Sequence, residues 1–256
     1  MKWCVSGSSD GFMPAKRKRI VTGNGEERMK TMKNIGMLVA VEMDSIFARY
    51  GEPKDTEWHS GFDVYHFENG DYLLHVIHSG IGEIAAAAAT QLLIDRFGAE
   101  LVVNFGVVGG LTEEAAQSAL CVVTKVVHYD FDISGIDRVQ PAQYPGYPDV
   151  FLPADEFLVD RACEICPQLK RVVCASADKF VGNREDKTRL QSLYGADICE
   201  MESAAVLLTC RRNHVPCLMI KAVSDGLTGG GKEYYEALQE CSALCLSVTD
   251  QVIRGL

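Results

Sequence analysis

The chain has 256 residues, of which 47% are hydrophobic and 23% charged, so it can bury the core of a globular fold. Its formal net charge of −10 leaves no basic surplus to neutralise phosphates, which argues against general nucleic-acid binding. No apolar run approaches the ~20 residues that a membrane span needs, so we expect no membrane association.

The cysteines and histidines do not predict a metal site. The ten cysteines are scattered, which favours free thiols in a reducing cytoplasm over a disulfide framework. Cys163 and Cys166 have the C-x-x-C form, but no second pair lies at zinc spacing. The histidines lack a third ligand at useful spacing, and no G-x-S-x-G motif supports a Ser/His/Asp triad.

Residues 1–33 are polar and rich in glycine and lysine, without hydrophobic periodicity or a secretory apolar region. We expect a disordered N-terminal extension, or an over-long start with Met32 as the natural initiator. The basic run Lys16–Arg19 could bind nucleic acid or a membrane surface, but a solvated tail is the simpler interpretation.

From Asn34 onward, strand-like and helix-like segments alternate. Residues 35–41 are a continuous apolar run of strand length, and 62–67 and 72–77 are predicted strands around a turn signal at 68–71. The other predicted elements are a helix at 83–97, strands at 101–105 and 120–128, a loop at 130–151, a helix at 155–166, a strand at 171–177, helices at 184–194 and 202–213, a strand at 217–224 and a helix at 234–256. This alternation predicts an α/β sandwich around a mostly parallel or mixed sheet, in one domain at 34–256.

Two glycine-rich segments could bind an anion through backbone N–H groups. Gly80-Ile81-Gly82 precedes a helix, and Gly106 to Gly110 follows a strand. Neither is a dinucleotide-binding fingerprint, and each could serve only tight strand–helix packing. Neither carries an arginine, which a phosphate co-substrate would favour, so water is the favoured second substrate.

Two acidic segments are expected at a strand-to-helix or strand-to-loop edge, on the rim where ligands bind in alternating α/β folds. Glu200 and Glu202 flank one methionine, and Asp225 follows Ser224 at the end of the strand at 217–224. One carboxylate could hold ribose hydroxyls while another protonates a leaving base. Helix capping is the alternative interpretation of Glu202, of Ser224-Asp225 and of Asp44.

Taken together, these segments resemble the 5′-methylthioadenosine/S-adenosylhomocysteine nucleosidases of the purine nucleoside phosphorylase/uridine phosphorylase superfamily. E-M-E at 200–202 followed by A-V-S-D at 222–225 is the specific part of the match. The other matching segments are 35–44, 79–82, 104–111, 130–132, 143–146 and 176–181. The resemblance implies a three-layer α/β/α sandwich with a central mixed sheet, usually a homodimer, that hydrolyses adenine nucleosides without a metal or organic cofactor.

By position, the resemblance makes Asp225 the acid that protonates purine N7, assisted by Ser224, and makes Glu202 the ligand of the ribose hydroxyls. Protonating the base yields a neutral leaving group, so we expect Asp225 to be buried beside an apolar wall. The resemblance also implies other substrate-binding positions. Met201 would lie against the sugar, Phe180 would stack on the base, and the backbone of Val181 would contact the adenine edge. Val107 and Gly109 are the positions in the glycine segment, and Ile133, Ile136 and Pro145 would reach into the neighbouring subunit's 5′-substituent pocket.

The sequence departs from the family pattern near the nucleophile. The family's water-activating glutamate falls at Asp44, whose side chain is one methylene shorter, and Glu42 is the alternative. The family's serine in the glycine segment is Val107, and Ser118-Ala119 replaces its usual Gly-Asp. We expect a nucleosidase acting on methylthioadenosine or adenosylhomocysteine. A phosphate-dependent phosphorylase and a catalytically impaired nucleoside-binding protein are the alternatives.

Overall fold

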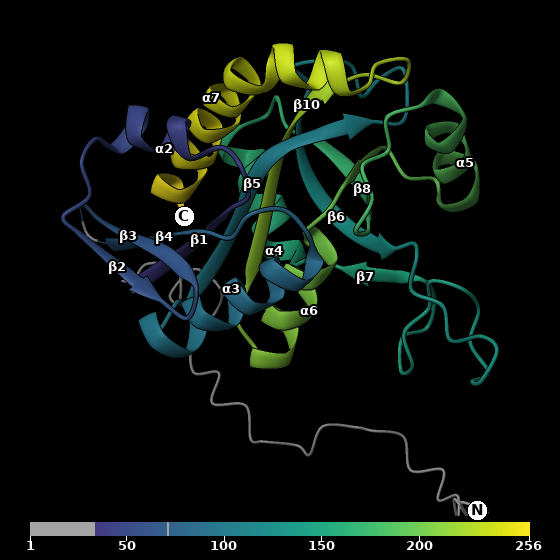
Figure 1. Ribbon diagram of the computed structural model, residues 1–256, viewed down its shortest axis with the longest axis horizontal. Coiled ribbons are helices and arrows are strands. Elements are labelled where there is room, and N and C mark those ends of the chain that lie inside the picture. Colours follow the sequence, from purple (N-terminus) through teal and green to yellow (C-terminus); the bar gives the residue numbers. More distant parts are fainter. Residues whose placement is uncertain (1–33, 71) are drawn as a thin grey trace, which may run out of the picture.

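The computed structural model describes residues 34–70 and 72–256 (Figure 1). The N-terminal extension expected at residues 1–33 lies outside these ranges. In chain order the elements are β1 (Asn34–Val39), α2 (Met43–Tyr50), β2 (Asp55–His59), β3 (Phe62–Asn69), β4 (Tyr72–His78), α3 (Glu83–Phe97), β5 (Leu101–Gly110), β6 (Leu120–His128), β7 (Phe151–Pro153), α4 (Glu156–Ile165), β8 (Lys170–Ser176), α5 (Arg184–Tyr194), β9 (Ile198–Glu200), α6 (Ser203–Asn213), β10 (Cys217–Asp225) and α7 (Gly231–Gly255). None of the helices in these ranges combines the length and hydropathy that a membrane crossing requires.

The described strands form one mixed sheet. β1 pairs in parallel with β4 and β5, whereas β2, β3 and β4 pair antiparallel as successive strands. The predicted hairpin between β3 and β4 is therefore confirmed. On the other side of β5 the sheet closes into a ring, because β10 pairs with β5 and β6 while β9 pairs with β5 and β8.

Helices cover both faces of the sheet. Alternate side chains of a strand point to opposite faces, so Leu218 and Ile220 pack in the core shared with α4 and α7, while Met219 and Val223 pack in the core shared with α3 and α6. Figure 1 shows α2 and α7 on one side of the sheet and α3 and α6 on the other. This is the predicted three-layer α/β/α sandwich with a central mixed sheet.

Four short elements escaped the sequence analysis, namely α2, β2, β7 and β9. β9 spans three residues, too few for a period-2 pattern to emerge. The capping interpretation of Ser224-Asp225 is wrong, because both residues end β10. Asp44 is also no cap: the residue at the N-cap of α2 is Glu42, which makes no side-chain cap hydrogen bond.

Candidate active site

The strand pairing brings the two acidic segments to one rim. Gly109 of β5 pairs with Cys199 of β9 on one side and with Asp225 of β10 on the other. Glu200 and Asp225, which end these strands, therefore lie around the carboxyl end of β5. This juxtaposition follows from the ring closure of the sheet and needs no assumption about a ligand.

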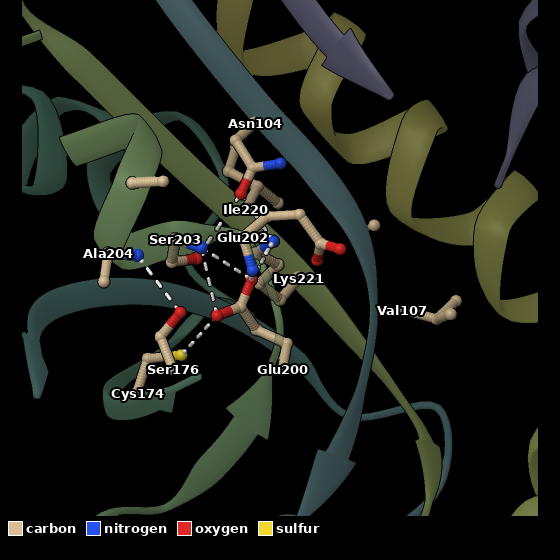
Figure 2. A network of polar contacts seen from close by, with 12 residues as sticks. Asn104, Val107, Cys174, Ser176, Glu200, Glu202, Ser203, Ala204, Ile220 and Lys221 are labelled. Carbon is tan, nitrogen blue, oxygen red and sulfur yellow. Dashed lines mark hydrogen bonds and ion pairs between the residues drawn. The ribbon is translucent and has the colours of Figure 1, made fainter. Parts of the chain in front are cut away.

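Glu200 is a buried anchor for the start of α6. Figure 2 shows its carboxylate directed at the backbone of Glu202 and Ser203, whose N–H groups donate to it over 3.1 and 2.9 Å. Burial alone would raise the pKa of Glu200. The ammonium of Lys221, 3.4 Å away, and these hydrogen bonds outweigh burial and lower the pKa below its ordinary value. Glu200 is therefore an ionised structural group.

Lys221 supplies the positive charge in the middle of β10. Its Nζ donates to Asn104 Oδ1 over 2.6 Å, and the side chain is buried. Burial disfavours the ammonium, but the carboxylates of Glu200 and then Glu202 raise the pKa of Lys221 above its ordinary value. The cluster thus keeps one permanent cation beneath the glutamates.

Glu202 presents its carboxylate away from Glu200 (Figure 2). Its Oε1 accepts the N–H of Gly82 over 2.9 Å, from the first glycine segment. Burial, followed by the charge of Glu200, raises the pKa of Glu202 to about 7. Near neutral pH this group can both accept and donate hydrogen bonds, which suits contact with sugar hydroxyls.

The carboxylate beside the second glycine segment belongs to Glu42, not Asp44. Glu42 is buried, and its Oε1 accepts the N–H of Val107 over 3.0 Å. Its charge contributes to the raised pKa of Glu202, so the two groups are close neighbours. Asp44 lies two residues on, in the first turn of α2, exposed and hydrogen-bonded to Gln239. The structure therefore favours the alternative position for this carboxylate.

Both glycine segments already donate to carboxylates. The N–H of Gly82 donates to Glu202, and the N–H of Val107 donates to Glu42. A Cβ at Gly106 would lie 2.7 Å from Glu42 Oε1, so the absence of a side chain there is what admits Glu42. Each segment thus places one backbone N–H against a buried carboxylate.

Asp225 lies on the other side of β5 and is 1% exposed, buried as expected. Its Oδ1 lies 3.0 Å from Ser224 Oγ, which also lies 3.2 Å from the carbonyl oxygen of Val108. Its Oδ2 accepts from Lys187 Nζ over 2.6 Å. The sequence analysis did not foresee this ammonium. A Cβ at Gly109 would lie 3.4 Å from Asp225 Oδ2, so Gly109 lines this acid closely.

The segment before α5 and the start of α7 supply aromatic rings. Phe180 is 49% exposed, and its ring meets that of Tyr234 edge-on at 5.8 Å between centroids. Val181 is buried and packs in the core beside α5. Burial and then the charge of Glu42, with smaller effects of other site carboxylates, raise the pKa of Tyr234 to about 12. Tyr234 therefore lies beside the acidic cluster.

Of the remaining predicted positions, Met201 lies between Glu200 and Glu202, whereas the three positions of the long loop are not brought into this cluster within one chain. Met201 is half-buried between β9 and α6. Ile133, Ile136 and Pro145 lie in the loop of residues 129–150, which projects from the body of the fold beside β7 (Figure 1). Ile136 is 90% exposed. Stacking of Phe131 on Tyr144, with centroids 3.9 Å apart, supports this loop from within.

Two buried lysines and one glutamate that the sequence analysis missed complete the site, and local signals existed for the lysines. Lys221 interrupts an otherwise apolar strand, which is the sequence signature of a buried charge with a partner. Lys187 lies three residues before the buried Leu190, on the same face of α5. Glu83, which accepts the hydroxyl of Ser176 over 2.5 Å, gave no signal beyond its position at a helix start.

In the described ranges, no three His, Cys, Asp or Glu side chains are arranged to hold a metal ion. The chemistry that these residues offer is acid–base chemistry: a buried acid on one side of β5 and several carboxylates on the other. The acid on one side can protonate one part of a substrate, while the carboxylates on the other side stabilise positive charge on another part.

Comparison with known proteins identifies the family of the chain. The sequence model of the Phosphorylase superfamily matches residues 18–255. The 5′-methylthioadenosine/S-adenosylhomocysteine nucleosidase of Hydrogenovibrio crunogenus is 32% identical over 66% of this chain and 75% of the relative. The aminodeoxyfutalosine nucleosidase of Helicobacter pylori strain 26695 is 30% identical over 83% of this chain and 94% of the relative. The crystal structure of Helicobacter pylori 5′-methylthioadenosine/S-adenosylhomocysteine nucleosidase superposes with a TM-score of 0.82 at 26% identity, covering 88% of this chain and 99% of that one.

Proposed function

Because the chain belongs to the Phosphorylase superfamily, we propose that it is a purine nucleosidase, which uses water to cleave the N-glycosidic bond of an adenine nucleoside. The observation that carries this proposal is the occupation of both glycine segments by carboxylates. A phosphate placed there would meet the negative charges of Glu42 and Glu202 instead of free amides. Neutral water meets no such repulsion.

On the sugar side, we assign the ribose hydroxyls to Glu202 and place Met201 against the sugar. The pKa of about 7 at Glu202 supports this role, because a partly protonated carboxyl can match either a hydroxyl donor or a hydroxyl acceptor. Glycoside cleavage passes through an oxocarbenium-like sugar. The surplus of carboxylates over Lys221 stabilises that positive charge as it develops.

We assign activation of the water to Glu42 in place of Asp44. Glu42 is held by the N–H groups of Val41 and Val107, each over 3.0 Å, so its carboxylate has a fixed direction. As the water oxygen bonds to the anomeric carbon, the carboxylate takes up the water proton. The exposed Asp44 lacks this burial and fixed geometry.

On the base side, Asp225 is the proposed general acid, with Ser224 directing its Oδ1. The pair of electrons from the broken bond passes to the purine, and a proton from Asp225 to N7 lets adenine leave as a neutral molecule. The half-exposed ring of Phe180 supports stacking on the base. By the family resemblance, we assign contact with the adenine edge to the backbone of Val181.

Two classes of nucleoside, which differ in the 5′ substituent, have support as the substrate. The resemblance favours methylthioadenosine or adenosylhomocysteine, and the relatives include aminodeoxyfutalosine nucleosidases. We also propose a homodimer, in which Ile133, Ile136 and Pro145 of the loop at 129–150 approach the partner's substrate. The 90% exposure of Ile136 supports this, and light scattering on the full chain tests it.

The deciding experiment incubates the purified full chain with methylthioadenosine, adenosylhomocysteine, aminodeoxyfutalosine and adenosine, each with and without phosphate. Chromatography then identifies the released base and sugar. We expect adenine and a free sugar, at a rate that phosphate does not change.

Two outcomes would contradict the proposal. Phosphate-dependent formation of a sugar 1-phosphate would make the protein a phosphorylase. Tight binding of adenine or a nucleoside without turnover across the panel would make it a nucleoside-binding protein.

A further inference from the structure

Lys187 is a fully buried lysine with a complete set of partners. Its Nζ donates to Asp225 Oδ2 over 2.6 Å, to the carbonyl oxygen of Gly226 over 2.7 Å and to that of Gly229 over 3.2 Å. The side chain is 0% exposed. An ammonium has three protons, and each of them has an acceptor here. A charged group can be buried when all its hydrogen-bond donors have acceptors, as they do here.

The lysine also joins two segments that flank the proposed base position. It lies one turn into α5, whose N-cap Asn183 accepts from Asp186, and α5 directly follows the segment of Phe180 and Val181. Its carbonyl partners belong to residues 226–229, between β10 and α7. These two segments touch, because a Cβ at Gly230 would lie 2.7 Å from the carbonyl oxygen of Gly182.

Lys187 is the cation that faces Asp225. In the described part of the chain, the ion pair of Asp225 is made with Lys187. The other titratable groups facing this carboxylate are Cys199 on β9 and Tyr234 on α7. Burial raises the pKa of both Cys199 and Tyr234 to about 12, so neither carries charge near neutral pH.

We propose that Lys187 is a positioning residue for the proposed acid. Its ammonium fixes the carboxylate of Asp225 and the segment at 226–229 against the segment at 180–182, and it places a positive charge directly against that carboxylate. This inference rests on the proposed nucleosidase function, because it concerns the acid that serves the departing base.

The test compares Lys187→Met with wild type in steady-state kinetics from pH 5 to 10, using the nucleoside that wild type cleaves best. Arg189→Met is the matched control, because Arg189 is an exposed basic residue two positions away on α5. We expect the maximal kcat of Lys187→Met to fall about 100-fold through misplacement of the acid, with KM changing less than tenfold. We expect Arg189→Met to match wild type within about twofold.

The pH profile separates a charge effect from simple loosening of the fold. Removing a contacting cation lets a carboxyl keep its proton to higher pH, so the alkaline limb of kcat should move upward by about 1 unit or more in Lys187→Met. A purely structural lysine would lower kcat by the same factor at every pH. Lys187→Arg, which keeps the charge, should leave the limb where it is in wild type.

Each outcome decides the matter. An unmoved alkaline limb in folded Lys187→Met overturns the inference and leaves the nucleosidase function intact. If circular dichroism shows that Lys187→Met does not fold, Lys187→Gln, which can still donate to the two carbonyls, replaces it with the same expected shift. A wild-type chain that releases no adenine from the panel overturns the proposed function, and the role of Lys187 falls with it.

Discussion

The two sides of the candidate site balance their buried charges differently. On the sugar side, the carboxylates of Glu42, Glu200 and Glu202 share one lysine, Lys221. On the base side, the single carboxylate of Asp225 pairs with one lysine, Lys187. Both sides are buried, so the imbalance cannot be relieved by solvent and appears as a pKa of about 7 at Glu202.

This difference shows what each side is suited to stabilise. A surplus of negative charge favours a sugar that becomes positive and repels a phosphate nucleophile. On the base side, the pairing with Lys187 holds the carboxyl group of Asp225 in a fixed place. The predictions below alter first one side and then the other.

The largest effect should come from Asp225→Asn, which leaves the base side without a proton to donate. General acid catalysis contributes about 10² to 10⁴ in rate, and we expect kcat for adenine release to fall within that range. KM should change far less, because the sugar side is untouched. A loss smaller than tenfold would show that the base leaves without help from Asp225.

The next test distinguishes the two candidate carboxylates for water. Glu42→Gln removes the base that takes up the water proton, and we expect kcat to fall by about 10². Asp44→Asn alters an exposed side chain and should leave kcat within about threefold of wild type. The reverse order, measured in the same chromatographic assay, would return the role to Asp44.

A third prediction concerns the stability of the crowded sugar side. Burial, followed by the charge of Glu200, raises the pKa of Glu83 from 4.5 to about 8. The folded state therefore binds more protons than the unfolded state between these values, and the free energy of unfolding should fall as pH rises from 5 to 8. We expect the loss to be on the order of 3 kcal/mol.

Glu83→Gln mimics the protonated side chain and should flatten that decline, as urea denaturation at several pH values would show. Glu185→Gln, a change at an exposed carboxylate of α5, is the control and should keep the wild-type slope. An unchanged slope in Glu83→Gln would mean that other groups titrate.

The smallest effect is expected at Ser118, whose φ of 65° lies in the left-handed region. The N–H of Ser118 donates to the carbonyl oxygen of Val223, which lies two residues before Asp225. This hydrogen bond fixes the conformation of Ser118. Ser118→Gly should relieve the strain and raise the unfolding free energy by about 0.5 kcal/mol. Ala116→Gly, at a residue without positive φ, should lower it. Thermal unfolding measures both.

The sequence by itself determined the order of the longer elements and many of their bounds. Periodicity and turn signals are local, so the helices at 83–97 and 184–194 were predicted at the residues where α3 and α5 lie. The acidic segment at 222–225 was likewise predicted at the end of a strand, where β10 ends. That β9 and β10 both pair with β5 was not readable, because strand pairing depends on partners far apart in the chain.

Only the tertiary structure decided which acids face one another and what holds them. Glu42 and Asp44 are two residues apart, and where β1 ends and α2 begins determines that the first is buried and the second exposed. Lys187 and Asp225 are separated by 38 residues, and no local pattern connects them. A buried charge must find its partner in space, so the ion pairs of this site became visible only with the fold.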